Sequence, residues 1–286
     1  MRTPRYFRPQ KVEEAVAALS SDGKGAYVLA GGTDVVVKMR SGAIHPTLLV
    51  DIGRLGLGGI HTAQDAVLLG ATCTMAEIRR HPLLMAEFPL LTQAASRLGA
   101  NQIQHMATIG GNLCNASPAA DGACALLALG AKVMIRSPRG LRSMTLEEFL
   151  VGPGKTALEP GELVQTVSIP RLRPQGRVVQ SFHKMGGRNA LVCSLAAVAG
   201  FTVLEGERVV ESRLSLGAVG PTVLRAARAE SLLKNERLSP ELARTAAAAA
   251  AAEAQPITDH RATGDYRQRL VSALVRSHLQ ECLPNV

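Results

Sequence analysis

Two periodicities alternate along the first half of the chain, and together they predict a mixture of helices and strands. Near the N-terminus, Val12, Val16 and Leu19 recur at helical spacing before a Ser-Ser-Asp-Gly stop. Short apolar runs that end in glycine are typical of strands, and the run at 26–30 indicates a buried strand that leads into a glycine loop. We expect helices at residues 11–19, 74–80 and 89–98 and strands at residues 26–30, 48–52 and 67–69.

The middle of the chain continues this mixture after a second pair of glycines. An Ala- and Leu-rich stretch at 121–129 predicts a buried helix, and the Ser-Pro-Arg-Gly turn at 137–140 predicts a hairpin. Residues 162–169 follow as a strand. Residues 170–177 then carry two prolines, a glycine and three arginines, which is typical of a domain boundary. We therefore divide the chain after residue 172.

Beyond this boundary the pattern predicts strands first and helices afterwards. The expected strands are residues 178–184, 191–204 and 208–219, and the expected helices are residues 225–233, 240–254 and 266–282. Residues 245–254 are low in complexity, but alanine has the highest helix propensity, so a packed helix is favoured over disorder.

Composition narrows the class of protein. The 286 residues are 47% hydrophobic, enough for a sizeable core, and the formal net charge is +9. The basic residues are scattered and only 3% of residues are aromatic, which argues against a nucleic-acid partner. The first residues lack the apolar segment of a signal peptide, and no run of roughly 18 apolar residues occurs. We expect a cytoplasmic protein with no membrane span.

Cysteine and histidine positions give no pattern of a metal site or of a disulfide framework. The five cysteines are odd in number and not closely paired, and the seven histidines contain no H-E-x-x-H motif. The G-x-S-x-G motif of a nucleophile elbow is also absent. The sequence therefore predicts no metal and no catalytic side chain in this chain.

The candidate chemistry lies in two glycine motifs, Leu-Ala-Gly-Gly-Thr-Asp at 29–34 and Thr-Ile-Gly-Gly-Asn at 108–112. Paired glycines accept positive φ and can turn consecutive backbone N–H groups toward one point, which suits a pyrophosphate. Thr33, Thr108 and Asn112 add neutral donors. Either motif alone fits a simple tight turn, but the two together predict a dinucleotide clamp. Neither matches G-x-G-x-x-G or the nucleotide-triphosphate loop.

A few charged and polar residues extend this candidate site. Asn115, Ser117 and Asp121 stand where the second motif runs into a helix start, which favours anions, although Ser117 and Asp121 also fit ordinary N-caps. Because a carboxylate repels a diphosphate, Asp121 and Asp34 are expected to face another polar part of a ligand. Lys184 closes a strand and offers a point charge, although a solvated lysine is the commoner explanation.

These motifs, in this order and spacing, resemble the FAD-binding subunits of molybdenum hydroxylases over nearly the whole chain. The resemblance also includes Tyr-Phe-Arg-Pro at 6–9, Leu-Cys-Asn-Ala-Ser-Pro at 113–118 and Gly-Pro-Gly-Lys-Thr at 152–156. It is closest to the bacterial xanthine dehydrogenase FAD subunit, and the chain is also similar to the medium subunit of carbon monoxide dehydrogenase.

The resemblance implies an α+β fold. A two-lobed FAD-binding domain of the vanillyl-alcohol-oxidase (PCMH) type would span 1–172, with lobes at about 1–56 and 57–172, and a smaller C-terminal α/β domain would span 173–286. Noncovalent FAD would lie between the lobes, with the pyrophosphate between the two glycine motifs. The cofactor-binding residues implied are Val28, Leu29, Ala30, Gly31, Gly32, Thr33, Asp34, Val35, Leu98, Thr108, Ile109, Gly110, Gly111, Asn112, Asn115, Ser117, Asp121, Val164 and Lys184.

The resemblance also implies partners. A large subunit with the molybdenum cofactor would oxidise the substrate, a small subunit with 2Fe-2S clusters would pass electrons on, and the FAD of this chain would deliver them to NAD or another acceptor. Related reductases insert a cysteine-rich loop after the second motif, but no insertion separates Cys114 from Cys124 here, so we expect no cluster. Gly-Gly-Arg-Asn-Ala at 186–190 replaces a more acidic segment of many xanthine dehydrogenases, which leaves the NAD contact open.

Two alternatives remain at this point. The chain could be a free-standing FAD-dependent reductase or oxidase, which would turn over substrate alone. It could instead be an assembly module whose glycine motifs are only turns, in which case it would copurify with partners without a chromophore.

Overall fold

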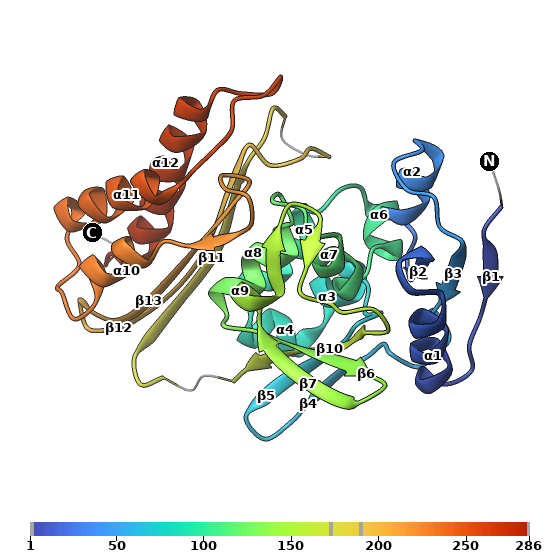
Figure 1. Cartoon of the computed structure of the whole chain (residues 1–286). Helices are drawn as coiled ribbons and strands as arrows, with labels where there is room; N and C mark the ends of the chain where they lie inside the picture. Colours follow the sequence, from blue (N-terminus) through green and yellow to red (C-terminus); the bar gives the residue numbers. More distant parts are fainter. Residues whose placement is uncertain (1–2, 172–173, 189–190, 285–286) are drawn as a thin grey trace.

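The computed structural model describes residues 3–171, 174–188 and 191–284, which form three layered units along the chain (Figure 1). The predicted boundary after residue 172 falls on residues 172–173, which lie outside the described part. An N-terminal lobe, a larger middle lobe and a C-terminal unit follow one another in space in the same order as in the sequence. This arrangement confirms the expected α+β fold class.

The N-terminal lobe is a small parallel sheet with two helices. Strand β3 (Leu48–Asp51) is the central strand, between β1 (Arg5–Phe7) and β2 (Ala26–Leu29). Helix α1 (Val12–Asp22) packs its apolar stripe on this sheet, and α2 (Val35–Arg40) follows the first glycine motif. β3 is buried throughout, whereas every residue of β2 is only half-buried. The expected buried strand is therefore wrong for β2, because it forms the edge of the sheet.

The middle lobe combines an antiparallel sheet with a cluster of short helices. Its strands are β4 (Ile60–Thr62), β5 (Ala66–Gly70), β10 (Leu163–Pro170), β6 (Lys132–Ser137) and β7 (Gly140–Thr145), paired in that order. Its helices are α3 (Met75–Arg80), α4 (Pro82–Glu87), α5 (Pro89–Arg97), α6 (Asn101–Met106), α7 (Ile109–Asn115), α8 (Asp121–Ala128) and α9 (Leu146–Phe149). A small ribbon of β8 (Leu150–Gly152) and β9 (Lys155–Thr156) completes it.

The C-terminal unit is an antiparallel sheet with helices on one face. The strands are β11 (Arg177–Met185), β12 (Ala196–Glu205), β13 (Arg208–Gly217) and β14 (Leu224–Arg225), and the helices are α10 (Ala227–Leu233), α11 (Pro240–Glu253) and α12 (Gly264–Cys282). The expected strand at 191–204 begins only at Ala196, and Ser194 in the segment before it bonds Asp121 of the middle lobe.

Strand β12 is the element that joins this unit to the middle lobe. Successive side chains of a strand point to opposite faces. Ala197, Ala199 and Phe201 pack into the core of the middle lobe, whereas Ala196 and Val198 pack under the C-terminal helices. Since both faces of β12 are buried, the middle lobe and the C-terminal unit share one interface through the sheet.

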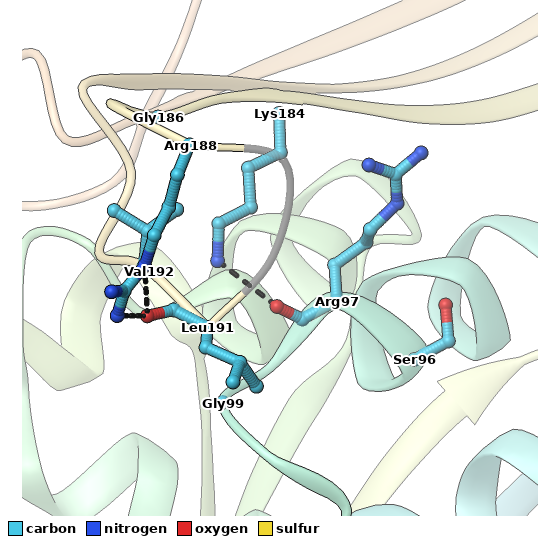
Figure 2. A pocket seen from close by; sticks show the side chains of 8 residues that line it. All are labelled: Ser96, Arg97, Gly99, Lys184, Gly186, Arg188, Leu191 and Val192. Carbon is cyan, nitrogen blue, oxygen red and sulfur yellow. Dashed lines mark hydrogen bonds between the residues drawn. The ribbon is translucent and has the colours of Figure 1, made fainter.

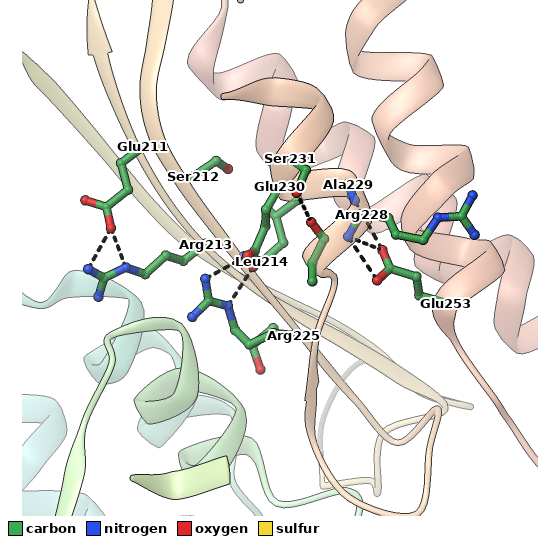
Figure 3. A network of polar contacts seen from close by, with 12 residues as sticks. Glu211, Ser212, Arg213, Leu214, Arg225, Arg228, Ala229, Glu230, Ser231 and Glu253 are labelled. Carbon is green, nitrogen blue, oxygen red and sulfur yellow. Dashed lines mark hydrogen bonds and ion pairs between the residues drawn. The ribbon is translucent and has the colours of Figure 1, made fainter. Parts of the chain in front are cut away.

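Carboxylates tie the C-terminal helices to the sheet edge (Figure 3). Glu230 on α10 accepts hydrogen bonds from Arg225, at 2.6 and 2.7 Å, and from the amide of Leu214 on β13. Glu253 on α11 accepts from the amides of Arg228 and Ala229 in the first turn of α10. A carboxylate at a helix N-terminus satisfies donors that have no partner within the helix.

A buried histidine on α12 contacts two strands of the sheet on the face that the C-terminal helices cover. His278 Nδ1 lies 2.7 Å from Ser181 Oγ on β11, and its Nε2 lies 2.9 Å from Thr202 Oγ1 on β12. Burial lowers the pKa of His278 to about 3, with a smaller effect from His183. The imidazole is therefore neutral at physiological pH.

This buried imidazole predicts a loss of stability in mild acid. The pKa of His278 is about 3 when folded, whereas an unfolded histidine titrates near 6.5, so its stabilising effect is complete above the unfolded value and is lost as the pH falls toward 3. We expect a loss of roughly 2 to 3 kcal/mol in unfolding free energy by pH of about 4.5. Urea denaturation at neutral pH and at a pH of about 4.5 measures this loss of unfolding free energy. In the His278→Gln variant, the unfolding free energy should change less with pH. An unchanged slope in that variant would contradict the assignment.

Candidate functional site

The first glycine motif forms an open backbone cradle between β2 and α2. Gly32 has φ of 72°, a left-handed conformation that glycine adopts without strain. Within the described residues, the N–H groups of Gly31, Gly32, Thr33 and Asp34 donate to no protein acceptor. All residues from Val28 to Thr33 are half-buried and Asp34 is exposed. The motif thus presents unused amide donors at an accessible surface.

The residues that flank the second glycine motif lie directly against the first motif. A Cβ atom built on Gly31 would overlap the carbonyl oxygen of Met106 and would lie 2.6 Å from its carbonyl carbon. Asn115 adds a polar link between the lobes: its Oδ1 accepts from Lys38 Nζ at 2.6 Å and its Nδ2 donates to Asp34 Oδ1 at 3.0 Å. The first motif therefore lies beside both ends of the second, with a sequence separation of 81 residues between Asp34 and Asn115.

The second motif, however, is a helix start and not a loop. Gly110 and Gly111 belong to α7, and neither has a positive φ. The N–H groups of Ile109 and Gly110 donate to the carbonyls of Cys73 and Ala71, and that of Gly111 donates to Thr108 Oγ1 at 3.1 Å. The expectation that this motif offers free amides is wrong, because Thr108 caps the helix and the neighbouring strand end takes the other donors.

What the second motif offers instead is room and an unused polar atom. A Cβ on Gly111 would meet only the rotatable Thr108 hydroxyl, at 2.9 Å, and the residue is exposed. The buried Oδ1 of Asn112 has no hydrogen-bond partner among the described residues. A Cβ on Gly110, by contrast, would lie 2.7 Å from the Ala71 carbonyl oxygen. Gly110 therefore serves close packing, and Gly111 leaves an open face.

Asp121 and Lys184 form a buried ion pair between the middle lobe and the C-terminal unit. Asp121 Oδ2 lies 2.5 Å from Lys184 Nζ, and Asp121 Oδ1 accepts from Ser194 Oγ at 2.9 Å. Burial raises the pKa of Asp121, while the charge of Lys184 and the two hydrogen bonds oppose that shift. Asp121 is the first residue of α8 and is not its N-cap, and both of its oxygens have protein partners.

Four other residues that were predicted to bind the cofactor differ in how far they are buried. Ile109 and Val164 lie in the core of the middle lobe, at 0% and 1% exposure, and offer no surface to a ligand. Leu98 is partly buried against the same core. Ser117 caps a local turn by accepting from the amide of Ala119.

A small cavity of about 60 Å³ lies beside this ion pair, between the end of α5 and the segment after β11 (Figure 2). The residues that line it are Ser96, Arg97, Gly99, Lys184, Gly186, Arg188, Leu191 and Val192. Lys184 Nζ reaches across it to the carbonyl oxygen of Arg97 at 3.1 Å. The 186–190 segment, on which the NAD contact was left open, includes residues 189–190, which lie outside the described part.

Sequence reasoning missed Met106, Lys38 and Ser194. Met106 contributes through its carbonyl group, which leaves no trace in residue type. Lys38 lies in the short helix Val35–Arg40, which was not predicted because its first three residues are valines and valine has a low helix propensity. Ser194 stands in the segment predicted as strand.

The described part of the chain contains no group of three His, Cys, Asp or Glu side chains that could hold a metal ion. Its helices also include none that is long and apolar enough to cross a bilayer.

Comparison with known families accounts for almost the entire chain. Residues 2–172 match the family described as the FAD binding domain in molybdopterin dehydrogenase. Residues 180–282 match the CO dehydrogenase flavoprotein C-terminal domain. The two matches leave a gap at 173–179, which includes part of the proline-containing segment.

Individual proteins agree in both sequence and structure. The xanthine dehydrogenase FAD-binding subunit of Escherichia coli O157:H7 is 30% identical over 280 residues, covering 97% of this chain and 95% of the relative. The solved carbon monoxide dehydrogenase from Hydrogenophaga pseudoflava contains a chain with a TM-score of 0.93 at 30% identity, covering 98% of both chains. The structure of quinoline 2-oxidoreductase from Pseudomonas putida 86 contains a chain with a TM-score of 0.92 at 26% identity. The match covers 98% of this chain and 97% of that chain.

Proposed function

Since this chain belongs to the FAD-binding medium subunits of the molybdenum hydroxylase family, an oxidoreductase family, we propose that it carries electrons from a partner's iron–sulfur clusters to an external acceptor. The proposed partners are a large subunit with the molybdenum cofactor and a small 2Fe-2S subunit. NAD or another acceptor would take the electrons, and the complex would work in the cytoplasm. We further propose a domain division into residues 1–172 and 173–286.

The convergence of the two glycine motifs supports an FAD site between the lobes. The free N–H groups of residues 31–34 are suited to a diphosphate, because backbone amides donate without bringing a charge into a buried site. Gly111 leaves space for a ligand on the facing helix. The half-buried apolar residues of β2 would be covered by the bound cofactor.

Bound FAD supplies the redox chemistry, and this chain's residues supply binding and orientation. The first motif would hold the phosphates. The hydrogen bonds of Asn115 to Asp34 and Lys38 would hold the N-terminal and middle lobes in a fixed relative position. Lys184 would present positive charge near the ligand from the C-terminal unit. The absence of a nucleophile or general base motif from the sequence agrees with this division.

The function is tested by copurification and by substrate-dependent flavin reduction. Expressed with the products of neighbouring genes, the chain is expected to copurify with molybdenum- and iron-containing subunits and to show an oxidised-flavin absorbance band. The band should bleach with substrate only in the assembled complex. Turnover by the isolated chain would favour a free-standing flavoenzyme instead, and a colourless complex would favour an assembly module.

Gly111→Val tests the position of the cofactor. The valine side chain would fill the open face of α7, where only the Thr108 hydroxyl must move, so the fold should persist while FAD retention falls at least tenfold, about 1.4 kcal/mol of binding free energy. Flavin content per protein, with circular dichroism for the fold, measures it. Gly152→Val is the control, since its nearest neighbour is Lys155 Cδ at 4.0 Å. Full FAD content in Gly111→Val would remove this helix from the site.

A further inference from the structure

Asp121 holds both arms of the segment that connects β11 to β12. Lys184 lies near the end of β11 and Ser194 lies just before β12. Each bonds one oxygen of the Asp121 carboxylate. The amide of Leu195 donates to the carbonyl of Met185 at 2.8 Å and closes the base of this segment. A residue of the middle lobe thereby fixes a loop of the C-terminal unit at its base.

The three side chains are buried deeply enough for these contacts to be decisive. Asp121 is 4% exposed and Ser194 is 1% exposed, and the Lys184 side chain is 8% exposed. Unpaired charges in such surroundings are costly, so the carboxylate and the ammonium each depend on the other. Ser194 completes the set, because without it Asp121 Oδ1 would have no partner among the described residues.

Lys184 retains one donor beyond these contacts. An ammonium group has three N–H donors. Two are directed at Asp121 Oδ2 and at the Arg97 carbonyl oxygen, and no third acceptor lies within reach in the described part of the chain. Because Lys184 also lines the cavity at the end of α5, its remaining N–H is available to an oxygen acceptor of a ligand there.

We propose that Ser194 is a positioning residue, which acts through Asp121 and Lys184 to set the affinity of the chain for FAD. FAD affinity then depends on the docking of the C-terminal unit onto the middle lobe. This inference rests on the proposed FAD site, and it adds Ser194, whose hydroxyl has no contact with either glycine motif in the structure.

A pair of serine variants separates positioning from simple stability. Ser194→Ala removes the hydroxyl that crosses between the lobes. Ser212→Ala removes another buried hydroxyl, which bonds Thr202 at 3.0 Å entirely within the C-terminal unit. Both should lower the melting temperature by similar amounts, since each loses one buried hydrogen bond. Only Ser194→Ala should raise the FAD dissociation constant, by about tenfold, measured by flavin fluorescence on the full chain.

Two further variants keep the test informative. Ser194→Cys has nearly the volume of serine but a weaker donor, and should lie between wild type and Ser194→Ala. Asp121→Asn, which removes the charge partner of Lys184, should weaken FAD binding by about a hundredfold. Equal FAD affinity in the two alanine variants would overturn the positioning role while leaving the proposed function intact. A wild-type chain without FAD affinity would instead overturn the proposed function itself.

Discussion

Gly31→Ala is expected to reduce bound FAD to less than about a tenth of the wild-type content, the largest loss for any single methyl group added at the site. The added Cβ would overlap the carbonyl oxygen of Met106, which is backbone and cannot rotate aside. Either the N-terminal lobe moves away from the middle lobe or the cradle at 31–34 deforms. Both outcomes misplace the amides that we assign to the diphosphate.

The measurement is the flavin-to-protein ratio after purification, followed by titration of the apoprotein with FAD. Gly152→Ala is the matched control, because its Cβ would find no atom closer than 4.0 Å. Gly31→Ala should unfold at a lower temperature by only a few degrees, since the N-terminal lobe keeps its own small core. Normal FAD content in a folded Gly31→Ala protein would mean that the lobe contact is not part of the cofactor site.

Gly200→Ala is expected to cause the largest loss of stability in the C-terminal unit. A Cβ on Gly200 would overlap the ring of His278, which is fully buried and held by Ser181 and Thr202. Relief requires moving α12 or breaking the two imidazole contacts. We expect about 3 kcal/mol or more of destabilisation, at the upper end of the cost of overpacking a core.

Gly217→Ala provides the comparison on the neighbouring strand. Its Cβ would meet Cys124 Sγ at 3.4 Å and the Ala197 Cβ at 3.5 Å, which are ordinary van der Waals distances. Gly217→Ala should therefore unfold near the wild-type temperature, whereas Gly200→Ala should unfold well below it in a calorimetric scan. Similar melting temperatures for the two variants would show that α12 can shift at little cost.

Most of the elements followed from local patterns. The helices around α1, α5, α11 and α12 and the 137–140 hairpin were predicted because their apolar spacing and turn residues are encoded within a few positions. The errors have local causes too. No element was predicted at Val35–Arg40, which forms α2, and the Gly110–Gly111 pair, which suggested a turn, continues the helix that Thr108 caps.

The site was predictable in composition but not in its hydrogen bonds. Both glycine motifs were identified, and the structure brings them together through Gly31 and Asn115. Which amides remain free could not be predicted, because the partners of Ile109 and Gly110 come from residues 71–73. For the same reason the sequence assigned Asp121 to the cofactor or to an N-cap, although Lys184 and Ser194, at separations of 63 and 73 residues, bond it.

The amino-acid sequence by itself determined the family, the order of helices and strands, and the two glycine motifs of the candidate site. These are properties of neighbouring residues and of small side chains, which act over a few positions. Tertiary structure decided which N–H donors are left for a ligand. It also decided which face of β12 packs on the middle lobe and which packs under the C-terminal helices, and it placed Asp121 where it bonds the base of a loop of the C-terminal unit. Hydrogen-bond and charge partners are set by packing between distant segments, and their energies depend on burial that only the folded chain creates.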